Sequence, residues 1–348
     1  MFIMAQFLYS DHTSVRRREK TKITFVNKDL CALPAAENSS ARTAVIVVLS
    51  ARNNFDRRNL VRETYGTVRN ANNVQILGVV FMLGNADATG SDVTDSNKLQ
   101  EELDRFGDVV VGDFVDSYRN LTLKTIMAYD WITYYCREAQ MVVKTDDDVL
   151  VNIFELTKEL DSWSPTEVES LDIRCVTHWN EETVNDVNSK FYASPIDFPT
   201  GKFPKHCGGI GYVTTFGVIE RIADEISRSF PGRVCTHEDV FMTGIVVSHI
   251  NSNRNIFSRR SESVNLRHIN SGWVCYGLED YNNEDRFLRN FIKNTAMDSD
   301  IENLYTFREL YKRRIFYLLA SVSDYEYVYR RLWKIIESGF SPMIKVKY

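Results

Sequence analysis

The sequence predicts an α/β protein in which a mixed, mostly parallel central sheet is flanked by helices, with a helical extension at the C-terminus. Strand-like and helix-like segments alternate through the first half of the 348 residues, a pattern typical of parallel strands joined by right-handed crossovers. The composition is that of an ordinary globular protein, with 44% hydrophobic and 26% charged residues. The length fits about two domains, and one large α/β domain with additions is equally allowed.

Apolar residues indicate where these elements lie along the chain. Runs of strand length predict strands at 44–49, 74–83 and 109–114, and a fourth strand that begins at Met141 and leads into an acidic cluster. Helical spacing predicts helices at 52–62, 96–106, 121–136 and 153–160. An irregular stretch is expected at 161–204, and a long amphipathic segment at 301–336, whose spacing indicates core packing rather than a membrane anchor.

The pattern divides the chain into three parts. Residues 1–42 are polar and carry no sustained periodicity, so we expect an N-terminal tail or stem. Residues 43–275 hold the alternating elements and are expected to form the main domain. Residues 276–348 are expected to form a C-terminal helical extension.

Three consecutive aspartates, Asp146, Asp147 and Asp148, stand two residues behind the apolar run at 141–143. Adjacent carboxylates at the end of a buried strand lose hydration and repel each other, so a cation or strong donors must compensate them. Oxygen ligands suit magnesium, manganese or calcium, and such hard cations usually bind a phosphate group as well. An acidic surface loop is the alternative, but the apolar residues on both sides favour a metal that holds a phosphorylated ligand.

Charge and cysteine content exclude several classes of protein. The net charge of −5 provides no basic surface, so no nucleic acid is expected as a partner. The six cysteines include no C-x-x-C pair, which argues against zinc and fits either luminal disulfides or buried thiols. No run approaches the ~20 apolar residues of a membrane-spanning helix, so we expect the chain to be soluble or incomplete at its N-terminus.

A second acidic pair, Glu238 and Asp239, stands before an apolar segment. The pair either caps a helix or supplies a general base, which must reach a hydroxyl beside the bound ligand. His268 is either a structural histidine or a nitrogen ligand to the same metal. Gly209 belongs to a glycine cluster that permits close approach to a ligand, although its spacing matches no known phosphate-binding loop.

Basic residues follow the first strand and surround the acidic cluster in sequence. Arg57, Arg58 and Arg62 either neutralise a diphosphate or carboxylate, or form a solvated helix face. Lys124 and Lys144 are close in sequence to the strands that lead to the aspartates, and either could balance their charge.

Taken together, six segments resemble the beta-1,3-glycosyltransferase family, which includes the beta-1,3-galactosyltransferases and N-acetylglucosaminyltransferases. The first three are RNLVRETYG at 58–66, FMLG at 81–84 and DFVDSYRNLTLKT at 113–125. The others are KTDDDVLVN at 144–152, FPKHCGGIGY at 203–212 and EDVFMTG at 238–244. They follow the family's order over residues 44–275, which chance does not produce.

The resemblance implies a glycosyltransferase A-type fold, a UDP-sugar donor, bound manganese (Mn2+) and inversion at the anomeric carbon. Residues 43–275 then form the catalytic domain. The family's pattern implies that Asp148 and His268 bind the metal. It also implies that Asp146 or Asp147 orients the ribose or a metal-bound water.

The same resemblance assigns Asp239 as the catalytic base that takes a proton from an acceptor hydroxyl, with Glu238 as its competitor. Further residues are expected around the nucleotide sugar: Arg58, Arg62, Lys124 and Gly209. The expected reaction moves galactose or N-acetylglucosamine from the UDP-sugar to a glycan acceptor on protein or lipid, forming a beta-1,3 linkage. The alternative is a catalytically silent module of the same fold that binds a nucleotide sugar or glycan.

Some positions depart from the family pattern. Tyr65 stands in place of a tryptophan, Leu150 of a phenylalanine and His206 of a frequent tyrosine, and all three changes leave the chemistry intact. Members of the family are normally type II membrane proteins of the Golgi, so a Golgi-lumenal domain with membrane association is expected. Because no anchor is visible, we expect that the N-terminus is truncated.

Overall fold

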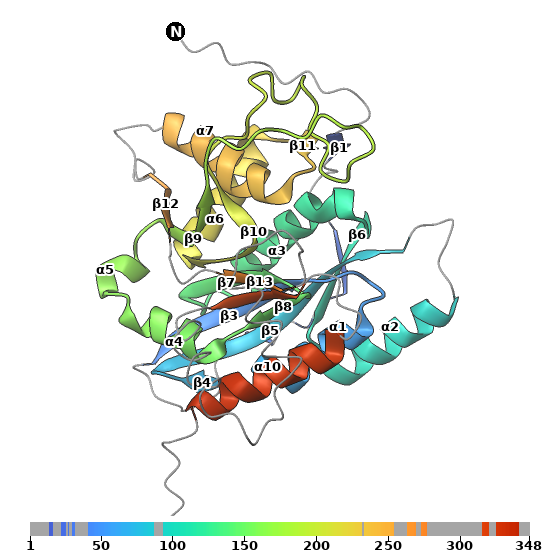
Figure 1. The fold of residues 1–348 in the computed structure, drawn as a ribbon, viewed down its shortest axis with the longest axis vertical. Coiled ribbons are helices and arrows are strands. Elements are labelled where there is room, and N and C mark those ends of the chain that lie inside the picture. The colour runs from blue at the N-terminus through green and yellow to red at the C-terminus, as the bar shows by residue number, and fades with distance from the viewer. Residues whose placement is uncertain are drawn as a thin grey trace, which may run out of the picture.

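A mixed β-sheet organises the computed structural model (Figure 1), which describes residues 14–16, 22–25, 27, 30–31, 41–86, 93–231, 233–253, 263–268, 273–276, 315–319 and 325–340. In spatial order its strands are β12 (Asn265–His268), β9 (Asp172–His178), β10 (His206–Thr215), β7 (Met141–Asp146), β3 (Arg42–Leu49), β5 (Val74–Asn85), β6 (Val109–Val115) and β2 (Ile23–Phe25), with β4 (Asn70–Ala71) beside β5. The central strands β7, β3, β5 and β6 are parallel, whereas β10 is antiparallel to both of its neighbours. The mixed, mostly parallel sheet predicted from the sequence is therefore confirmed.

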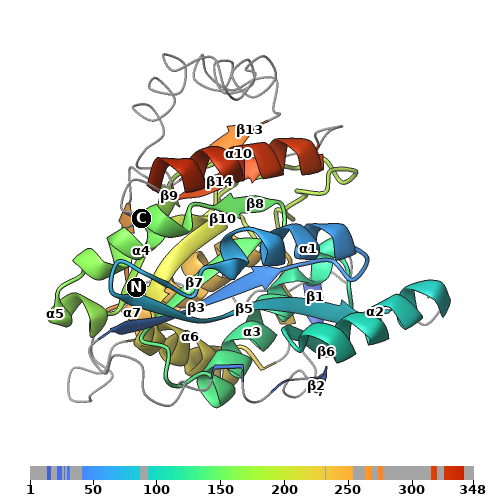
Figure 2. The ribbon, with the colours of Figure 1, turned by 90° about the horizontal axis from the view of Figure 1, so that it is seen from below.

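Helices cover both faces of this sheet (Figure 2). They are α1 (Phe55–Glu63), α2 (Val93–Phe106), α3 (Leu121–Tyr135), α4 (Ile153–Ser162), α5 (Pro165–Val168), α6 (Phe216–Ser229), α7 (Val246–Ser252) and α10 (Tyr325–Phe340). Short turns of helix are η1 (Tyr65–Thr67), η2 (Tyr118–Asn120) and η3 (Val240–Ile245), the last with π geometry.

The central strand β3 shows why the sheet needs helices on both sides. Ile46 and Val48 pack in the cluster formed with α1, α2, α4 and α10, while Val45 and Val47 pack in the cluster formed with α3, α6 and α7. Successive side chains of a strand point to opposite faces, so a continuous apolar run buries both.

The described residues near the N-terminus form strands that pair with the rest of the fold. β1 (Ser14–Arg16) pairs with β11 (Arg233–Cys235), and β2 pairs with β6, so the region expected to be a tail contributes two strands. Three-residue strands are too short to produce a visible alternation of apolar and polar residues. The division of the chain into three parts stays a prediction.

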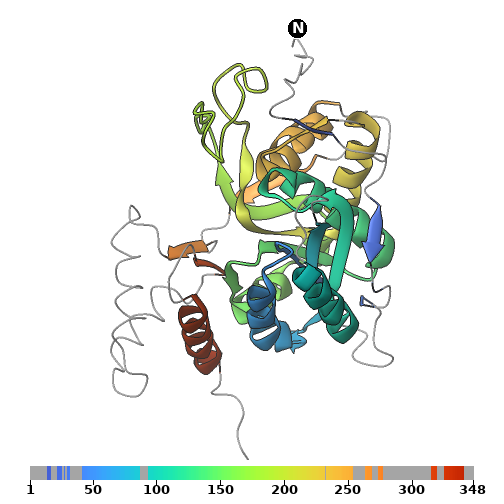
Figure 3. The ribbon, with the colours of Figure 1, turned by 90° about the vertical axis from the view of Figure 1, so that its right-hand side faces the viewer.

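At the C-terminal end, β13 (Trp273–Tyr276), β14 (Phe316–Leu319) and β8 (Val149–Val151) form a second, three-stranded sheet. The C-terminal helix α10 lies on the same side of the main sheet as α1 (Figure 3). The described part of the expected helical extension therefore contains the strand β14 as well as a helix. Within the part of the chain that the structure describes, every helix is too short or too polar to cross a lipid bilayer.

Candidate active site

The three aspartates form the end of β7 and the turn into β8. Asp146 is the last residue of β7 and pairs with Leu49, the last residue of the parallel strand β3. The backbone N–H of Asp147 donates to the carbonyl of Leu49 at 3.0 Å. Ligands of parallel sheets bind beyond the carboxyl ends of the strands, and the turn lies at such an end.

Asp147 fastens this turn to the loop that follows β3. Its Oδ2 accepts from Ser50 Oγ at 2.7 Å and from Asn54 Nδ2 at 2.8 Å, and its Oδ1 accepts from Arg57 at 3.0 Å. The backbone N–H of Ala51 adds a longer contact of 3.3 Å to Oδ2. A carboxylate has about four lone-pair sites, and these donors within the protein use those of Asp147. The side chain therefore holds the turn in place.

Asp146 and Asp148 carry negative charge that the protein compensates poorly. Burial, together with the charges of Asp146 and Asp147, raises the pKa of Asp148 to about 7. Its side chain is 32% exposed, and its nearest cation, Arg57, is 3.7 Å away. Burial outweighs the nearby Lys144 charge and, with Glu238, raises the pKa of Asp146 to about 6. Two under-compensated carboxylates fit a hard divalent cation.

No preformed metal centre is found among the described side chains, where no three His, Cys, Asp or Glu residues converge on one point. His268 ends β12, at the edge of the main sheet, and its side chain lies outside the described part of the chain. The predicted pairing of His268 with Asp148 on one metal therefore stays a prediction.

Lys144 connects the aspartate turn to the second acidic element. This buried side chain lies 2.5 Å from the carbonyl of Gly209, 3.0 Å from Asp146 Oδ1 and 3.3 Å from Glu238 Oε2. Burial lowers the pKa of Lys144, but the charges of Asp146 and Glu238 outweigh it and raise that pKa overall. The lysine stays charged and holds the two acidic segments together.

Glu238 and Asp239 differ in what their carboxylates can reach. Glu238 is 6% exposed and forms the ion pair with Lys144, and its burial raises its pKa. Asp239 is half-buried at the start of η3, where its Oδ1 accepts from the N–H of Val240 at 2.8 Å. Both residues line a pocket together with Asp146. Of the two, Asp239 has the more accessible carboxylate.

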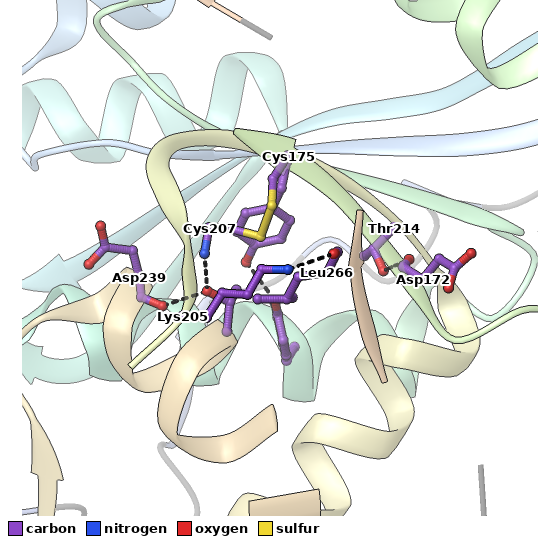
Figure 4. The surroundings of a disulfide bond; sticks show 10 residues. Asp172, Cys175, Lys205, Cys207, Thr214, Asp239 and Leu266 are labelled. Carbon is purple, nitrogen blue, oxygen red and sulfur yellow. Dashed lines mark hydrogen bonds between the residues drawn. A yellow bond between two sulfur atoms is a disulfide. The ribbon is translucent and has the colours of Figure 1, made fainter. Parts of the chain in front are cut away.

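Gly209 and Thr243 fix the place of Asp239. A Cβ atom at Gly209 would lie 3.2 Å from Asp239 Oδ2, so the absence of a side chain there leaves room for the carboxylate. Thr243 Oγ1 donates to the carbonyl of Asp239 at 2.7 Å and accepts from the N–H of Cys207 at 2.8 Å (Figure 4). The carbonyl end of Asp239 is thereby attached to β10, while its carboxylate points away (Figure 4).

Arg58 and Arg62 lie away from this pocket. Arg58 is fully buried, with two hydrogen bonds to Glu102 at 2.8 and 2.6 Å and others to Ser50 Oγ and the carbonyl of Ala51. Arg62 pairs with Asp108 and with Glu102, both at 2.7 Å. Both arginines connect α1 to α2, and their N–H groups are used in these contacts.

Lys124 joins the ends of three strands by hydrogen bonds. Its Nζ donates to the carbonyl of Ser50 at 2.5 Å and to Asp116 Oδ1 at 2.8 Å. Asp116 Oδ2 in turn accepts from the N–H of Gly84 at 2.9 Å. Lys124 thus ties together the ends of β3, β5 and β6 beside the site.

Arg57 faces the aspartates, although Arg58 and Arg62 were the arginines expected around the nucleotide sugar. Arg58 and Arg62 meet Glu102 of α2, whereas Arg57, near the start of α1, meets Asp147 of the turn. Helical spacing does not separate them, because Arg57 is one turn from the buried Val61.

Two aromatic side chains form a wall beside the pocket. Tyr118 and Phe191 meet edge to face with ring centroids 6.3 Å apart, and Lys190 Nζ lies 4.7 Å from the Phe191 ring. Burial and the charge of Asp239 raise the pKa of Tyr118 to about 12. The disulfide between Cys175 and Cys207 closes the loop that carries Phe191.

A comparison with models of protein families shows to which family this chain belongs. The family model described as galactosyltransferase matches residues 56–256, which include the aspartate turn, Lys144 and Asp239. The chain belongs to the galactosyltransferase family. This agrees with the resemblance and with the glycosyltransferase A-type fold expected from the sequence.

Among similar members of the family are beta-1,3-galactosyltransferase 1 of Mus musculus and of Homo sapiens. Each is 34% identical over 203 residues, which cover 57% of this chain and 58% of the relative. Beta-1,3-galactosyltransferase 5 of Pan paniscus is 32% identical over 210 residues, which cover 60% of this chain and 65% of the relative. The chain thus matches less than two thirds of the length of these relatives.

Solved structures with a related arrangement are more distant. The bifunctional glycosyltransferase WbbM aligns with 88% of this chain and 53% of its own, at 10% identity and a TM-score of 0.41. The galactosyltransferase LgtC, solved with donor and acceptor sugar analogues, aligns with 85% of this chain and 95% of its own, at 12% identity and a TM-score of 0.33.

Proposed function

We propose that this chain is an inverting glycosyltransferase that moves galactose or N-acetylglucosamine from a UDP-sugar to a hydroxyl of a glycan acceptor, forming a beta-1,3 linkage. One observation supports this most directly. In a member of the galactosyltransferase family, an accessible carboxylate, Asp239, shares a pocket with Asp146 of the aspartate turn. Donor chemistry and acceptor chemistry can therefore meet there.

The donor side rests on the aspartate turn. Asp148 would hold a divalent cation, Mn2+ in the family's pattern, with His268 as the second ligand that the family implies. When bound, the cation would neutralise charge on the leaving diphosphate. Asp147 and Lys144 keep the turn in position, and Arg57 pairs with Asp147 from the start of α1.

The acceptor side rests on Asp239. Its Oδ2 takes the proton of the acceptor hydroxyl as the hydroxyl oxygen forms a bond to the anomeric carbon. At the same time the bond from that carbon to the diphosphate oxygen breaks, and its electron pair leaves with UDP. Attack from the side opposite the leaving group inverts the anomeric configuration. Glu238 is less suited to this role because it is buried and paired with Lys144.

Tyr118 and Phe191 are placed to receive the acceptor sugar. Their side chains are 49% and 48% exposed, and both adjoin the pocket that holds Asp239. Amphipathic aromatic rings offer apolar faces on which the C–H face of a sugar can pack while its hydroxyl groups stay hydrated.

The Golgi lumen is the proposed location, with membrane association as in the type II members of the family. Two disulfides, Cys31–Cys136 and Cys175–Cys207, support passage through an oxidising compartment.

The test is a panel of UDP-sugars assayed for release of UDP and for transfer to a panel of glycans. We expect release that stops with a chelator and returns with Mn2+. The Asp239→Asn variant should lose about 10²–10⁴-fold in transfer rate while it binds the donor normally. The matched control is Asp104→Asn, which changes an exposed aspartate on α2. Saturable donor binding with no turnover on any acceptor would instead establish the silent binding module.

A further inference from the structure

The C-terminal part of the chain reaches the aspartate turn, although it lies outside the matched residues 56–256. β14 pairs antiparallel with β8, the strand that directly follows the turn. The N–H of Leu319 donates to the carbonyl of Asp148 at 2.9 Å, and the N–H of Asn152 donates to the carbonyl of Ile315 at 2.8 Å. Backbone hydrogen bonds to β14 therefore hold both ends of the segment 148–152.

Tyr325, the first residue of α10, contacts the turn itself. Its hydroxyl donates to the backbone carbonyl of Asp147 at 3.1 Å. The guanidinium of Arg57 lies over its ring, 5.0 Å from the centroid. Since Arg57 also pairs with Asp147 and lies 3.7 Å from Asp148, one tyrosine contacts both the backbone of the turn and the cation beside it.

This segment is firmly packed where it meets the site. Phe316 lies over β10, where a Cβ atom at Gly211 would come within 2.9 Å of its ring, so the glycine is required for the close approach. Farther along α10, Tyr329 and Leu332 are buried in the core shared with α1 and α4, and Trp333 stacks on Phe154 with ring centroids 6.1 Å apart. Tyr325 is thus presented from a rigid base.

We propose that β14 and Tyr325 position the donor site: they fix the backbone of the Asp147–Asp148 turn and the orientation of Arg57, and so set the affinity for the metal and the nucleotide diphosphate. The proposal rests on the proposed function for the identity of the ligand. Tyr325 is a positioning residue in this account, since it acts through the turn and through Arg57.

Two substitutions separate the contacts of Tyr325. Tyr325→Phe removes the hydrogen bond to the turn but keeps the ring under Arg57, and it should weaken binding of UDP with Mn2+ by about two- to tenfold. Tyr325→Ala removes both contacts and should weaken it by a further several-fold, roughly the value of one cation–π contact. Tyr327→Ala is the matched control, because Tyr327 is 55% exposed on the same helix and contacts Arg331 rather than the turn.

Binding is measured by calorimetry with UDP and Mn2+, and the KM values for donor and acceptor are measured separately. Hydrogen exchange at the N–H of Asp147, which is bonded to Leu49, gives a readout that needs no ligand. We expect faster exchange there and a raised donor KM with an unchanged acceptor KM.

Equal exchange and equal UDP affinity in Tyr325→Ala and Tyr327→Ala would overturn the proposal, as would a parallel rise of both KM values. If the unsubstituted protein binds no UDP, the proposed function fails, while the exchange experiment still tests whether Tyr325 holds the turn.

Discussion

At the scale of single residues, two adjacent arginines of α1 have different environments and are expected to have different roles. Arg57 and Arg58 have the same chemistry and stand beside each other, yet Arg58 is buried on Glu102 while Arg57 is 35% exposed beside Asp147. The run of basic residues predicted positive charge near a diphosphate. Which side chain carries it depends on the partner that each one meets, Glu102 of α2 or Asp147 of the turn.

We therefore expect opposite phenotypes from these two arginines. Arg58→Met leaves Glu102 buried with only Arg62 beside it, and it should lower the free energy of unfolding by about 3 kcal/mol. Arg57→Met should change that free energy by less than about 1 kcal/mol but weaken binding of UDP with Mn2+. Chemical denaturation and calorimetry on both variants measure this, and the reverse pattern would contradict our assignment.

Gly209 permits a second test at this scale. In Gly209→Ala the new methyl group would lie 3.2 Å from Asp239 Oδ2, so it should displace the carboxylate and lower kcat by about tenfold or more, as small misplacements of reacting groups do. Gly217→Ala is the control, because its Cβ would make an ordinary contact with Leu171 at 3.4 Å. Equal kcat values in the two variants would show that Gly209 does not shape the site.

The acidic residues show which features of the site the sequence predicts and which it does not. The apolar run that begins at Met141 was enough to place Asp146–Asp148 at the carboxyl end of a strand, and β7 ends there. The motif did not show that Asp147 has its oxygens occupied by Ser50, Asn54 and Arg57, while Asp148 stays under-compensated. Donors from a distant loop make that difference, and they leave no local pattern.

At the scale of elements, the strands with long apolar runs were the predictable ones. β3 and β5 are buried on both faces, and such runs stand out in any sequence. β9 was missed inside the stretch expected to be irregular, because Ile173 and Cys175 are the only fully buried apolar side chains among its residues. β14 falls where a helical extension was expected, since its pairing with β8 joins segments far apart in sequence.

The disulfide between β9 and β10 gives a prediction for the loop that it closes. Cys175→Ser with Cys207→Ser opens a loop of 32 residues and should lower the free energy of unfolding by about 3–4 kcal/mol. It should also raise the acceptor KM more than the donor KM, because Phe191 is carried by this loop.

The control is the double serine variant of Cys31 and Cys136, which join α3 to the N-terminal region across 105 residues. It should lose stability without a selective change in acceptor KM. Thermal unfolding and steady-state kinetics under matched conditions compare the two. A selective acceptor effect in the control, or none in the Cys175–Cys207 variant, would remove the loop from acceptor recognition.

At the scale of the whole molecule, the site is assembled from distant parts of the chain. The loop after β3, the end of β7, the start of η3 and the first residue of α10 all contribute, and the last of these lies 178 residues from the aspartate that it contacts. The motifs at 144–152 and 238–244 include the second and third of these, whereas the loop after β3 precedes the first motif, which begins at Arg58. Tyr325 carried no such pattern, and only the packing of α10 against α1 and α4 brings it to the turn.

Because the ligand-free site holds excess negative charge, its ligands should stabilise the whole fold. UDP with Mn2+ at about 100 times its Kd should add about 2.7 kcal/mol to the free energy of unfolding, which thermal scanning detects as a raised Tm. Asp148→Asn should abolish this shift, yet without ligand its Tm should equal or exceed that of the unsubstituted protein, because one of three crowded like charges is gone. The Asp104→Asn control should keep both the original Tm and the full shift. If a variant at Asp148 still responds fully to UDP and Mn2+, another side chain binds the metal. Asp146 is then the next candidate, because it lines the pocket that holds Asp239.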